Sequence, residues 1–422
     1  MSRFTAAEWQ RIRDRLNAEP GRYGLPARVY GSAVLASANV RKLGARSRRD
    51  AHTWQFFADV FRHFDLLAVQ EVLDDMDGLR HIAALMGDGF GLVVSDTTGS
   101  FPNEGGLAER LAFVFNWSVV QRKELVTDVT YDRTKVLEIL FDNDRVIHEA
   151  IQKARDDPAY RRKLQDYEER LRKFEAEGGR RPVRPSLPVK MPVFLSFIRT
   201  PFAVMFEIRG HPGAERYTFL AVNAHLYYGT YIDDRRQEFD ALMAWIMGRV
   251  QQGDVNDSLN IVLLGDLNLD FDNPDNDRPR IVELIDRLNR TGGRQVEVYF
   301  PFLHPHPPTA GQQLMGRDGR LLRTNARLSE TFDQIGLFSR DARLKRLDNL
   351  RAGVAERGPD FGVFDFVNLF SEALLERTFD ELSAAERQAF VARFEHAVSD
   401  HMPLWFRIPL PDVEPGRAAR PP

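Results

Sequence analysis

The chain contains no cysteine among its 422 residues, which excludes a disulfide framework, a thiolate metal site and a cysteine nucleophile. It also lacks any run that approaches the roughly 18 consecutive apolar residues of a membrane helix. Residues 1–22 are charged throughout and have no apolar centre of the kind found in export signals. We therefore expect a cytoplasmic protein without a membrane span.

An excess of charge of one sign is also missing. The chain has 58 Lys+Arg against 61 Asp+Glu and a formal net charge of −3, which argues against a protein that coats nucleic acid through bulk charge. A local basic groove stays open as an alternative. The segment RKLGARSRRD (41–50) fits contacts with backbone phosphates, and it fits an ordinary solvated loop equally well.

Apolar runs typical of buried strands recur along the chain, and amphipathic segments typical of helices separate some of them. Residues 50–64 place their aromatic side chains on one helical face, and residues 233–250 form a similar segment with Asp233 as the expected N-cap. Strands are predicted at 29–40, 65–70, 91–94, 110–116, 201–208, 217–226 and 260–265. Continuous apolar strands separated by helices predict a layered α/β or α+β domain whose sheets are covered by helices.

A strongly charged stretch at 143–190 has the character of an insertion. Asp157 and Pro158 form an N-cap and first-turn pair that divides it into two helices. An apolar stripe at 4-3-4-3 spacing runs along the second helix and consists of Tyr160, Leu164, Tyr167, Leu171 and Phe174. The stretch is interpreted as a solvated hairpin packed on its own domain, or alternatively as a dimerisation arm or a wall of a substrate groove. In the arm interpretation its partner is a second copy of the chain or a regulatory protein.

These features predict the following organisation of the chain. A helical extension at 1–28 precedes the main domain at 29–410, which carries insertions at about 143–190 and 340–398. A proline-rich tail follows at 411–422.

Polar side chains follow the apolar runs repeatedly, at positions where the ends of strands hold loops rigidly. They are Asn39, Glu71, His225, Asp266, Asn268, Asp333, Asp400 and His401. Carboxylates without cysteines are hard oxygen donors, suited to Mg²⁺, Mn²⁺ or Ca²⁺. Two histidines can supply a general acid and a general base near neutral pH, and side-chain amides can donate to phosphoryl oxygens. Together these groups provide what phosphate-ester hydrolysis needs.

The segments that hold these residues resemble the signatures of the endonuclease/exonuclease/phosphatase superfamily, the group similar to pancreatic-type deoxyribonuclease. The matching segments are SANV (37–40), VQEV (69–72), NAHL (223–226), GDLNLD (265–270), TFDQI (331–335) and SDHMPLW (399–405). Their order and strand contexts agree along residues 29–410. The resemblance implies an α+β fold, a four-layer sandwich of two packed mixed β-sheets flanked by helices.

The resemblance also implies a metal-binding side of the site. Glu71 would be the main ligand of a divalent metal, with Mg²⁺ expected and Mn²⁺ or Ca²⁺ as alternatives. Asn39 would help to hold the metal or the substrate phosphate, and Asp400 would complete the acidic cluster.

The remaining matched residues would carry the proton transfers. His225 and His401 would be the acid–base pair, and Asp333 would orient His401 by accepting its ring N–H. Asp266 would position or activate the attacking water, and Asn268 would bind the phosphate.

Three weaker matches extend this site. Glu109, in AERLAFVF (108–115), matches a carboxylate that pairs with the first histidine, which here is His225. Arg199, in RTPFAVMF (199–206), matches an arginine that contacts the scissile phosphate. Either could instead be a surface charge at the start of a strand. Tyr131 is a further candidate for substrate contact.

The branch of the superfamily is narrowed by particular residues. His225 argues against abasic-site endonucleases, and TFDQIGL lacks the tryptophan and arginine usual in inositol-phosphate phosphatases. The expected function is a metal-dependent nuclease that hydrolyses DNA phosphodiester bonds with little sequence specificity. One alternative is a phosphatase or phospholipid phosphodiesterase of the inositol-phosphate or sphingomyelin type. The other is a catalytically silent binding or scaffold module.

Overall fold

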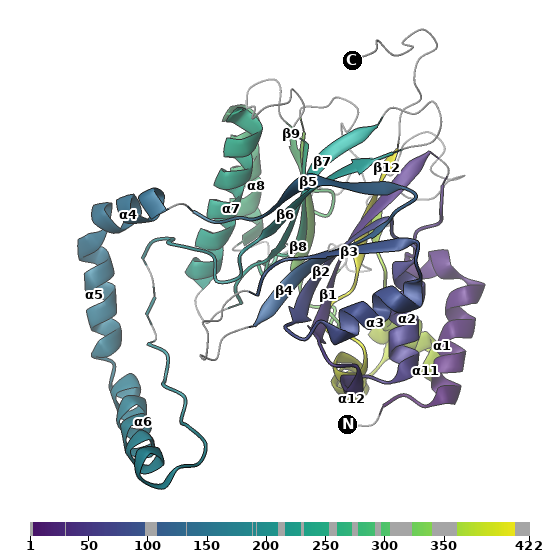
Figure 1. Cartoon of the computed structure of the whole chain (residues 1–422). Helices are drawn as coiled ribbons and strands as arrows, with labels where there is room; N and C mark the ends of the chain where they lie inside the picture. The colour runs from purple at the N-terminus through teal and green to yellow at the C-terminus, as the bar shows by residue number, and fades with distance from the viewer. Residues whose placement is uncertain are drawn as a thin grey trace.

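The strands of the computed structural model form two mixed sheets (Figure 1). Their bounds are β1 Ser32–Leu43, β2 Leu66–Leu73, β3 Phe90–Val94, β4 Glu109–Asn116, β5 Val120–Asp128, β6 Phe202–Ile208, β7 Tyr217–His225, β8 Asn260–Asp266, β9 Glu297–Tyr299, β10 Asp333–Ser339, β11 Phe361–Val363 and β12 Leu404–Pro409. One six-stranded sheet has the order β11-β12-β1-β2-β4-β3, and the other has the order β5-β6-β7-β8-β10-β9. The structure describes residues 3–29, 31–97, 108–131, 133–187, 189–190, 192–209, 216–228, 232–252, 260–271, 277–291, 297–303, 323–339 and 361–409.

Each sheet contains one parallel pair of strands with a helix in its crossover connection. β1 is parallel to β2, and α2 (Ala51–Phe61) connects them. β7 is parallel to β8, and α7 (Ile232–Gln252) connects them. Because the carboxyl ends of parallel neighbours lie at the same edge of a sheet, each crossover unit brings two of the predicted polar motifs together.

Helices cover the outer face of both sheets. The remaining helices are α1 Ala6–Ala18, η1 Pro20–Tyr23, η2 Arg46–Arg48, α3 Asp77–Met86, α4 Arg133–Asp142, α5 Asp144–Arg155, α6 Pro158–Glu177, α8 Asp277–Thr291, α11 Phe366–Leu375, η4 Phe379–Glu381 and α12 Ala384–Ala397. α1, α2, α3, α11 and α12 lie on the side of the first sheet, and α7 and α8 lie on the side of the second (Figure 1). Rings such as Phe113 and Phe206, with centroids 5.3 Å apart, fill the space between the sheets. The predicted four-layer sandwich is confirmed.

The N-terminal helix and the second predicted insertion belong to one helical layer. Trp9 of α1 is fully buried, and its ring meets Phe370 of α11 edge-on at 5.4 Å. Glu372 of α11 accepts hydrogen bonds from Arg15 and Tyr23 at 2.8 Å each. These contacts bury α1 against residues that are more than 350 positions away in the chain.

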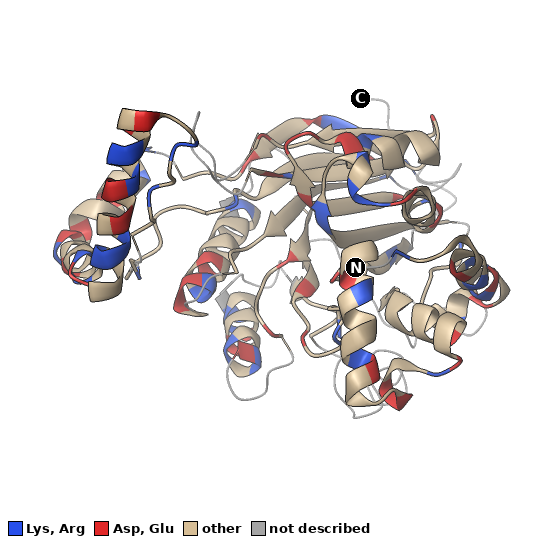
Figure 2. Cartoon of the chain, turned by 90° about the horizontal axis from the view of Figure 1, so that it is seen from below, with Lys and Arg blue, Asp and Glu red and all other residues tan. Residues whose placement is uncertain are grey.

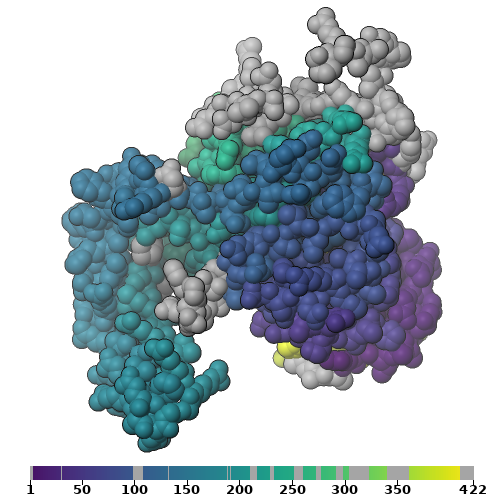
Figure 3. All heavy atoms as spheres, in the orientation of Figure 1, coloured from purple at the N-terminus to yellow at the C-terminus, as the bar shows by residue number. Residues whose placement is uncertain are grey.

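The first predicted insertion forms an arm of three helices, α4, α5 and α6, and this corrects two expectations. The helices begin at Arg133 instead of 143, and the arm stands off from the two-sheet body instead of packing on it (Figures 1 and 3). Asp157 is the N-cap of α6, as predicted, and its carboxylate accepts from the backbone N–H of Ala159 and Tyr160. Acidic and basic side chains alternate along the arm (Figure 2).

Two other details complete the comparison with the predicted elements. α7 begins at Ile232, so Asp233 lies in its first turn and is not the N-cap. The predicted tail at 411–422 and residues 340–360 of the second insertion lie outside the described residues. Within the described ranges, no helix combines the length and the apolar character needed to cross a membrane.

Candidate active site

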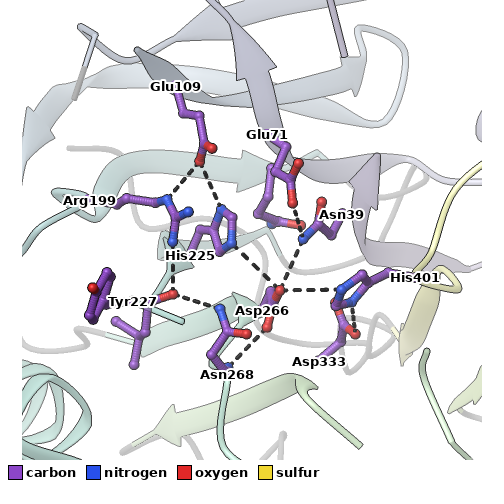
Figure 4. A network of polar contacts seen from close by, with 12 residues as sticks. Asn39, Glu71, Glu109, Arg199, His225, Tyr227, Asp266, Asn268, Asp333 and His401 are labelled. Atoms are coloured by element: carbon purple, nitrogen blue, oxygen red, sulfur yellow. Dashed lines mark hydrogen bonds and ion pairs between the residues drawn. The ribbon is translucent and has the colours of Figure 1, made fainter. Parts of the chain in front are cut away.

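The predicted polar residues converge where the carboxyl ends of the two parallel strand pairs meet (Figure 4). The pairing of β1 with β2 shifts register just beyond Asn39, and Glu71 lies in the left-handed region at φ 57°. A bulge of this kind re-aims side chains at the end of a strand. Asn39 and Glu71 are therefore brought into contact although they lie at a break in the ladder.

Asn39 links the two sheets across the site. Its side-chain Nδ2 donates to Asp266 Oδ2 at 3.0 Å and to Glu71 Oε1 at 3.3 Å. The second oxygen of Glu71 accepts from the backbone N–H of Lys42 at 3.0 Å. One amide thus connects carboxylates that come from different sheets.

His401 is held by Asp333 as the sequence predicts. The ring Nδ1 of His401 lies 2.8 Å from Asp333 Oδ2, and its Nε2 lies 3.7 Å from Asp266 Oδ2. Burial by itself would lower the pKa of His401, but the charges of Asp333, Asp266 and Asp400 outweigh burial and raise it well above the ordinary value. These carboxylates therefore favour the protonated form of the His401 ring.

His225 forms a second pair on the other side of Asp266. Its Nδ1 lies 3.4 Å from Glu109 Oε2, and its Nε2 lies 3.7 Å from Asp266 Oδ2. Burial would raise the pKa of Glu109, but His225 and Arg199 lower it below the ordinary value. The two histidines thus point their Nε2 atoms at the same oxygen of Asp266 from opposite sides (Figure 4).

Asp266 and Asn268 lie at the end of β8 in the GDLN segment. The backbone N–H of Asn268 donates to Asp266 Oδ1 at 3.0 Å, and the Asn268 amide donates to the Leu226 carbonyl at 2.7 Å. Burial opposes the charged form of Asp266, but His401 and His225 lower its pKa below the ordinary value. Asp266 is a buried carboxylate with two imidazole neighbours.

The acidic side of the site suits a divalent cation. Asn39 Oδ1 and Asp400 Oδ1 are buried oxygens that accept no hydrogen bond from the described residues, so both are available as ligands beside Glu71. Burial raises the pKa of Asp400, and the nearby charge of Glu71 adds to this rise. An orphaned amide oxygen and closely spaced carboxylates are the hard donors that Mg²⁺ prefers.

A second set of donors lies next to these oxygens. Single atoms of Asp266, Asp333 and His401 lie within 4.8 Å of one another, close enough to hold a metal ion. The Nδ1 of His401 already faces Asp333 at 2.8 Å, however, as expected for an oriented histidine. Asp266 lies between Asn39 and Glu71 on one side and the two histidines on the other.

The weaker matches have different outcomes. Arg199 is buried, its Nε lies 2.7 Å from Glu109 Oε2, and it donates to the Leu226 carbonyl at 3.2 Å, so it lies in the site. Its contact with a scissile phosphate stays a prediction.

Tyr131 is not brought into this cluster by its described contacts. Its ring packs against Phe194, and its hydroxyl donates to the Ala241 carbonyl of α7. Substrate contact by Tyr131 stays a prediction.

Several polar residues that support the site were not predicted from the sequence. Gln70 Nε2 donates to Asn223 Oδ1 at 2.7 Å, and Asn223 Nδ2 donates to the carbonyls of Val69 and Ala112, which ties the two sheets together beneath the site. Both residues lie inside the motifs VQEV and NAHL, where a buried amide in an apolar strand was the available signal.

Glu238 of α7 is a further supporting residue. Its carboxylate accepts from the backbone N–H of Ile198 at 2.9 Å and of Tyr227 at 2.7 Å. Burial raises its pKa. It joins the segment before Arg199 to the segment after His225.

No protein-family model and no curated protein sequence matches the chain. Among solved structures, it is similar to an endonuclease/exonuclease/phosphatase family protein from Bacteroides thetaiotaomicron, with 12% identity, a TM-score of 0.42, and coverage of 89% of this chain and 97% of that one. It is similar to the human Nocturnin catalytic domain with bound sulfate, with 9% identity, a TM-score of 0.45, and coverage of 91% and 96%. It is similar to ANGEL2, a 2',3'-cyclic phosphatase, with 13% identity, a TM-score of 0.42, and coverage of 89% of this chain and 95% of that one.

Proposed function

We propose that this chain is a divalent-metal-dependent phosphodiesterase of the endonuclease/exonuclease/phosphatase type. The observation that carries the proposal is the convergence of two histidine–carboxylate pairs on one buried aspartate. His401 with Asp333, and His225 with Glu109, each place Nε2 3.7 Å from Asp266 Oδ2. A metal-binding edge, two proton-transfer groups and an anionic residue between them suit in-line hydrolysis of a phosphoester.

The metal would be held by Glu71 and Asn39, with Asp400 completing the acidic set. A bound Mg²⁺ would supply electrostatic stabilisation of the charge that develops on the phosphoryl oxygens. The amide of Asn268 and the guanidinium of Arg199 would donate further hydrogen bonds to the same oxygens.

The proton transfers are divided between the two histidines. His401 starts protonated, because its carboxylate neighbours raise its pKa, and it donates a proton to the leaving oxygen. His225, paired with Glu109, accepts a proton from the attacking water, which Asp266 positions through its buried carboxylate. Each pair joins a residue in or next to one sheet to a residue of the other sheet, and the substrate phosphate would lie between the two pairs.

We infer that the substrate is a nucleic acid, with DNA favoured and little sequence specificity. The support is the resemblance of the Glu109 and Arg199 segments to those of deoxyribonucleases, together with the contact between the two residues at 2.7 Å. The other candidates are a phosphatase, a phospholipid phosphodiesterase or a silent binding module, and a substrate panel distinguishes them from a nuclease.

The experiment is incubation of the purified protein with supercoiled plasmid in Mg²⁺, Mn²⁺, Ca²⁺ or EDTA. A matched panel contains RNA, inositol phosphates and sphingomyelin. The variant His401→Ala removes the proton donor, and His148→Ala, at an exposed position of α5, is the control. We expect metal-dependent nicking by the wild type and by His148→Ala, and a loss of about 10²-fold or more in His401→Ala.

The outcomes separate the proposals. Release of phosphate from a small ester or lipid, without nicking of plasmid, would contradict the proposed nuclease activity and support the proposed hydrolysis of phosphoesters. Near-wild-type turnover by His401→Ala would overturn the mechanism. Absence of hydrolysis of any substrate, together with absence of metal binding, would favour the silent module.

A further inference from the structure

A basic pocket lies where the N-terminal segment, the η2 turn and the end of α12 meet. It has a volume of about 370 Å³, and its basic lining consists of Arg3, Arg48, Arg49, Arg393 and His396. It contains none of the residues that converge on Asp266. Two of its arginines belong to the basic segment 41–50, whose role the proposed chemistry leaves unexplained.

Arg49 is a buried cation in the lining of this pocket. Its side chain is 7% exposed, and its guanidinium donates to the backbone carbonyls of Val398 and Arg41. Within the described residues it forms no ion pair, and burial lowers its pKa to about 10. Its hydrogen-bond partners are neutral carbonyls, and Asp400 and Glu71 act on it only through their charge, without an ion pair, so a bound anion would stabilise it further.

The other basic groups of the pocket add to this charge. Arg48 and His396 are exposed and have no hydrogen bond or ion pair with any described residue. Arg3 donates to the carbonyl of Ser47 at 3.1 Å, which leaves its charge uncompensated as well.

The carboxylates near the pocket are already engaged. Asp50 lines it, but its side chain is the N-cap of α2 and accepts from the backbone N–H of Thr53 at 2.8 Å. Glu8 neutralises Arg393 through two contacts of 2.8 and 2.7 Å. Within the lining of the pocket, Arg3, Arg48 and Arg49 therefore share a single carboxylate, that of Asp50, which caps α2.

We propose that this pocket binds a phosphate group at a site separate from the hydrolytic centre. Several guanidinium groups around one pocket match the charge and the tetrahedral oxygens of phosphate, because each guanidinium can present two parallel N–H donors. The volume lies at the lower end of the range of small-molecule sites, so it accommodates a phosphomonoester or a pyrophosphate. The group can come from free phosphate or from the end of a nucleic-acid strand.

The test measures binding without hydrolysis, so that its result is independent of the proposed function. Titration calorimetry is performed in EDTA with the His401→Ala protein and with inorganic phosphate and pyrophosphate as ligands. Arg48→Gln is added to this background because Arg48 is exposed and its replacement leaves the buried contacts of Arg49 in place. The control is Arg46→Gln in the same turn, whose guanidinium pairs with Asp77 at 3.1 Å and does not line the pocket.

We expect saturable binding that Arg48→Gln weakens about ten-fold, as loss of a charged hydrogen bond predicts, and that Arg46→Gln leaves unchanged. Absence of saturable binding would overturn the proposal, as would equal effects of the two variants or insensitivity to both. A second titration compares oligonucleotides with and without a 5′-phosphate. Binding that depends on the 5′-phosphate and on Arg48 identifies the strand end as the source, and binding of free phosphate alone identifies the small anion.

Discussion

Asp266 connects the two halves of the site at the scale of single residues. It accepts from the Asn39 amide, and both histidines approach its Oδ2 at the same distance. It is buried, and its pKa is nevertheless lowered, because the imidazole neighbours outweigh the effect of burial. The charge of this one side chain therefore depends on residues from both sheets.

The proton on His401 gives a prediction about pH. Because the pKa of His401 is raised, its proton is present at low and neutral pH and is lost as the pH rises through the raised value. Asp333→Asn removes the nearest negative charge, so the alkaline limb of the kcat/KM profile should move down by about one pH unit or more. Activity measured from acid to alkaline pH checks this, with Asp286→Asn on α8 as the control. An alkaline limb that stays in place would show that His401 is not the proton donor.

Gly265 gives a prediction about stability. A Cβ atom at this position would lie 1.8 Å from the Ala224 carbonyl oxygen, because β8 approaches β7 closely just before Asp266. Gly265→Ala should lower the free energy of unfolding by about 3 kcal/mol. Gly248→Ala is the matched control, since a Cβ there meets no atom within 4 Å inside α7, and it should stabilise the protein by about 0.5–1 kcal/mol. Urea unfolding measures both. Equal stability of the two variants would contradict the close approach.

At the scale of elements, the site depends on the two crossover units, and α7 is the helix of the second unit. α7 contributes Glu238, which holds the backbone of Ile198 and Tyr227. These segments lead into Arg199 and out of His225. The helix thus positions two site residues without touching the reacting atoms.

We therefore expect Glu238→Ala to reduce kcat by about ten-fold or more and to destabilise the fold, since two buried N–H groups lose their acceptor. Glu238→Gln keeps one oxygen acceptor and should recover part of kcat. Steady-state kinetics and urea unfolding of both variants separate the two effects. A variant that loses stability but keeps full kcat would limit Glu238 to a structural role.

A second element prediction concerns the docking of α1 on α12. Glu8 completes the capping box of α1 and pairs with Arg393, which lowers its pKa to about 2. A lowered pKa means that the stabilisation is present above the ordinary value of 4.5 and is lost as the pH falls toward 2. Glu8→Gln should therefore be less stable than the wild type by about 1 kcal/mol at neutral pH, with a difference that shrinks below pH 4.5. A difference that is independent of pH would contradict the ion pair.

At the scale of the whole molecule, the arm is the part that stands apart from the two-sheet body (Figure 3). Tyr160 of its apolar stripe is buried, Leu164 and Leu171 are half-buried, and Phe141 of α4 is 84% exposed. We propose that the arm binds a second copy of the chain or a regulatory protein. Exposed apolar side chains on a projecting element suit such a role.

Changing Leu164 and Leu171 together to Asp should weaken self-association and leave hydrolysis of a small phosphodiester unchanged, because the arm lies away from Asp266. Sedimentation velocity over a range of concentrations measures the association. The control is Glu168→Gln on the exposed face of the same helix. A wild type that stays monomeric at every concentration would contradict self-association. An association that the double variant does not alter would contradict the role of the arm in it.

Local sequence was enough to predict much of the scaffold. Apolar runs in the sequence predicted the strands around the site, and Asp157 with Pro158 predicted the start of α6. Apolar runs that end in a polar residue also identified Asn39, Glu71 and His225, since parallel neighbours bring such strand ends to one edge. Asp333 and His401 differ from this expectation, because Asp333 begins β10 and His401 precedes β12. The N-cap of α7 and the start of the arm were wrong because helix ends depend on contacts that periodicity does not record.

The sequence therefore predicted which polar residues form the site and their order along the chain, because strand ends and motifs are local properties. The partners were not, because they depend on distances across the fold. His401 meets Asp333 through 68 positions of chain, and Asn39 meets Asp266 through 227. Tyr131 and Arg49 show the same limit: the sequence did not predict that the Tyr131 ring packs against Phe194 or that Arg49 is buried beside a pocket. Packing of the two sheets and their helices decided these roles, since burial and charge pairing exist only once the chain is folded.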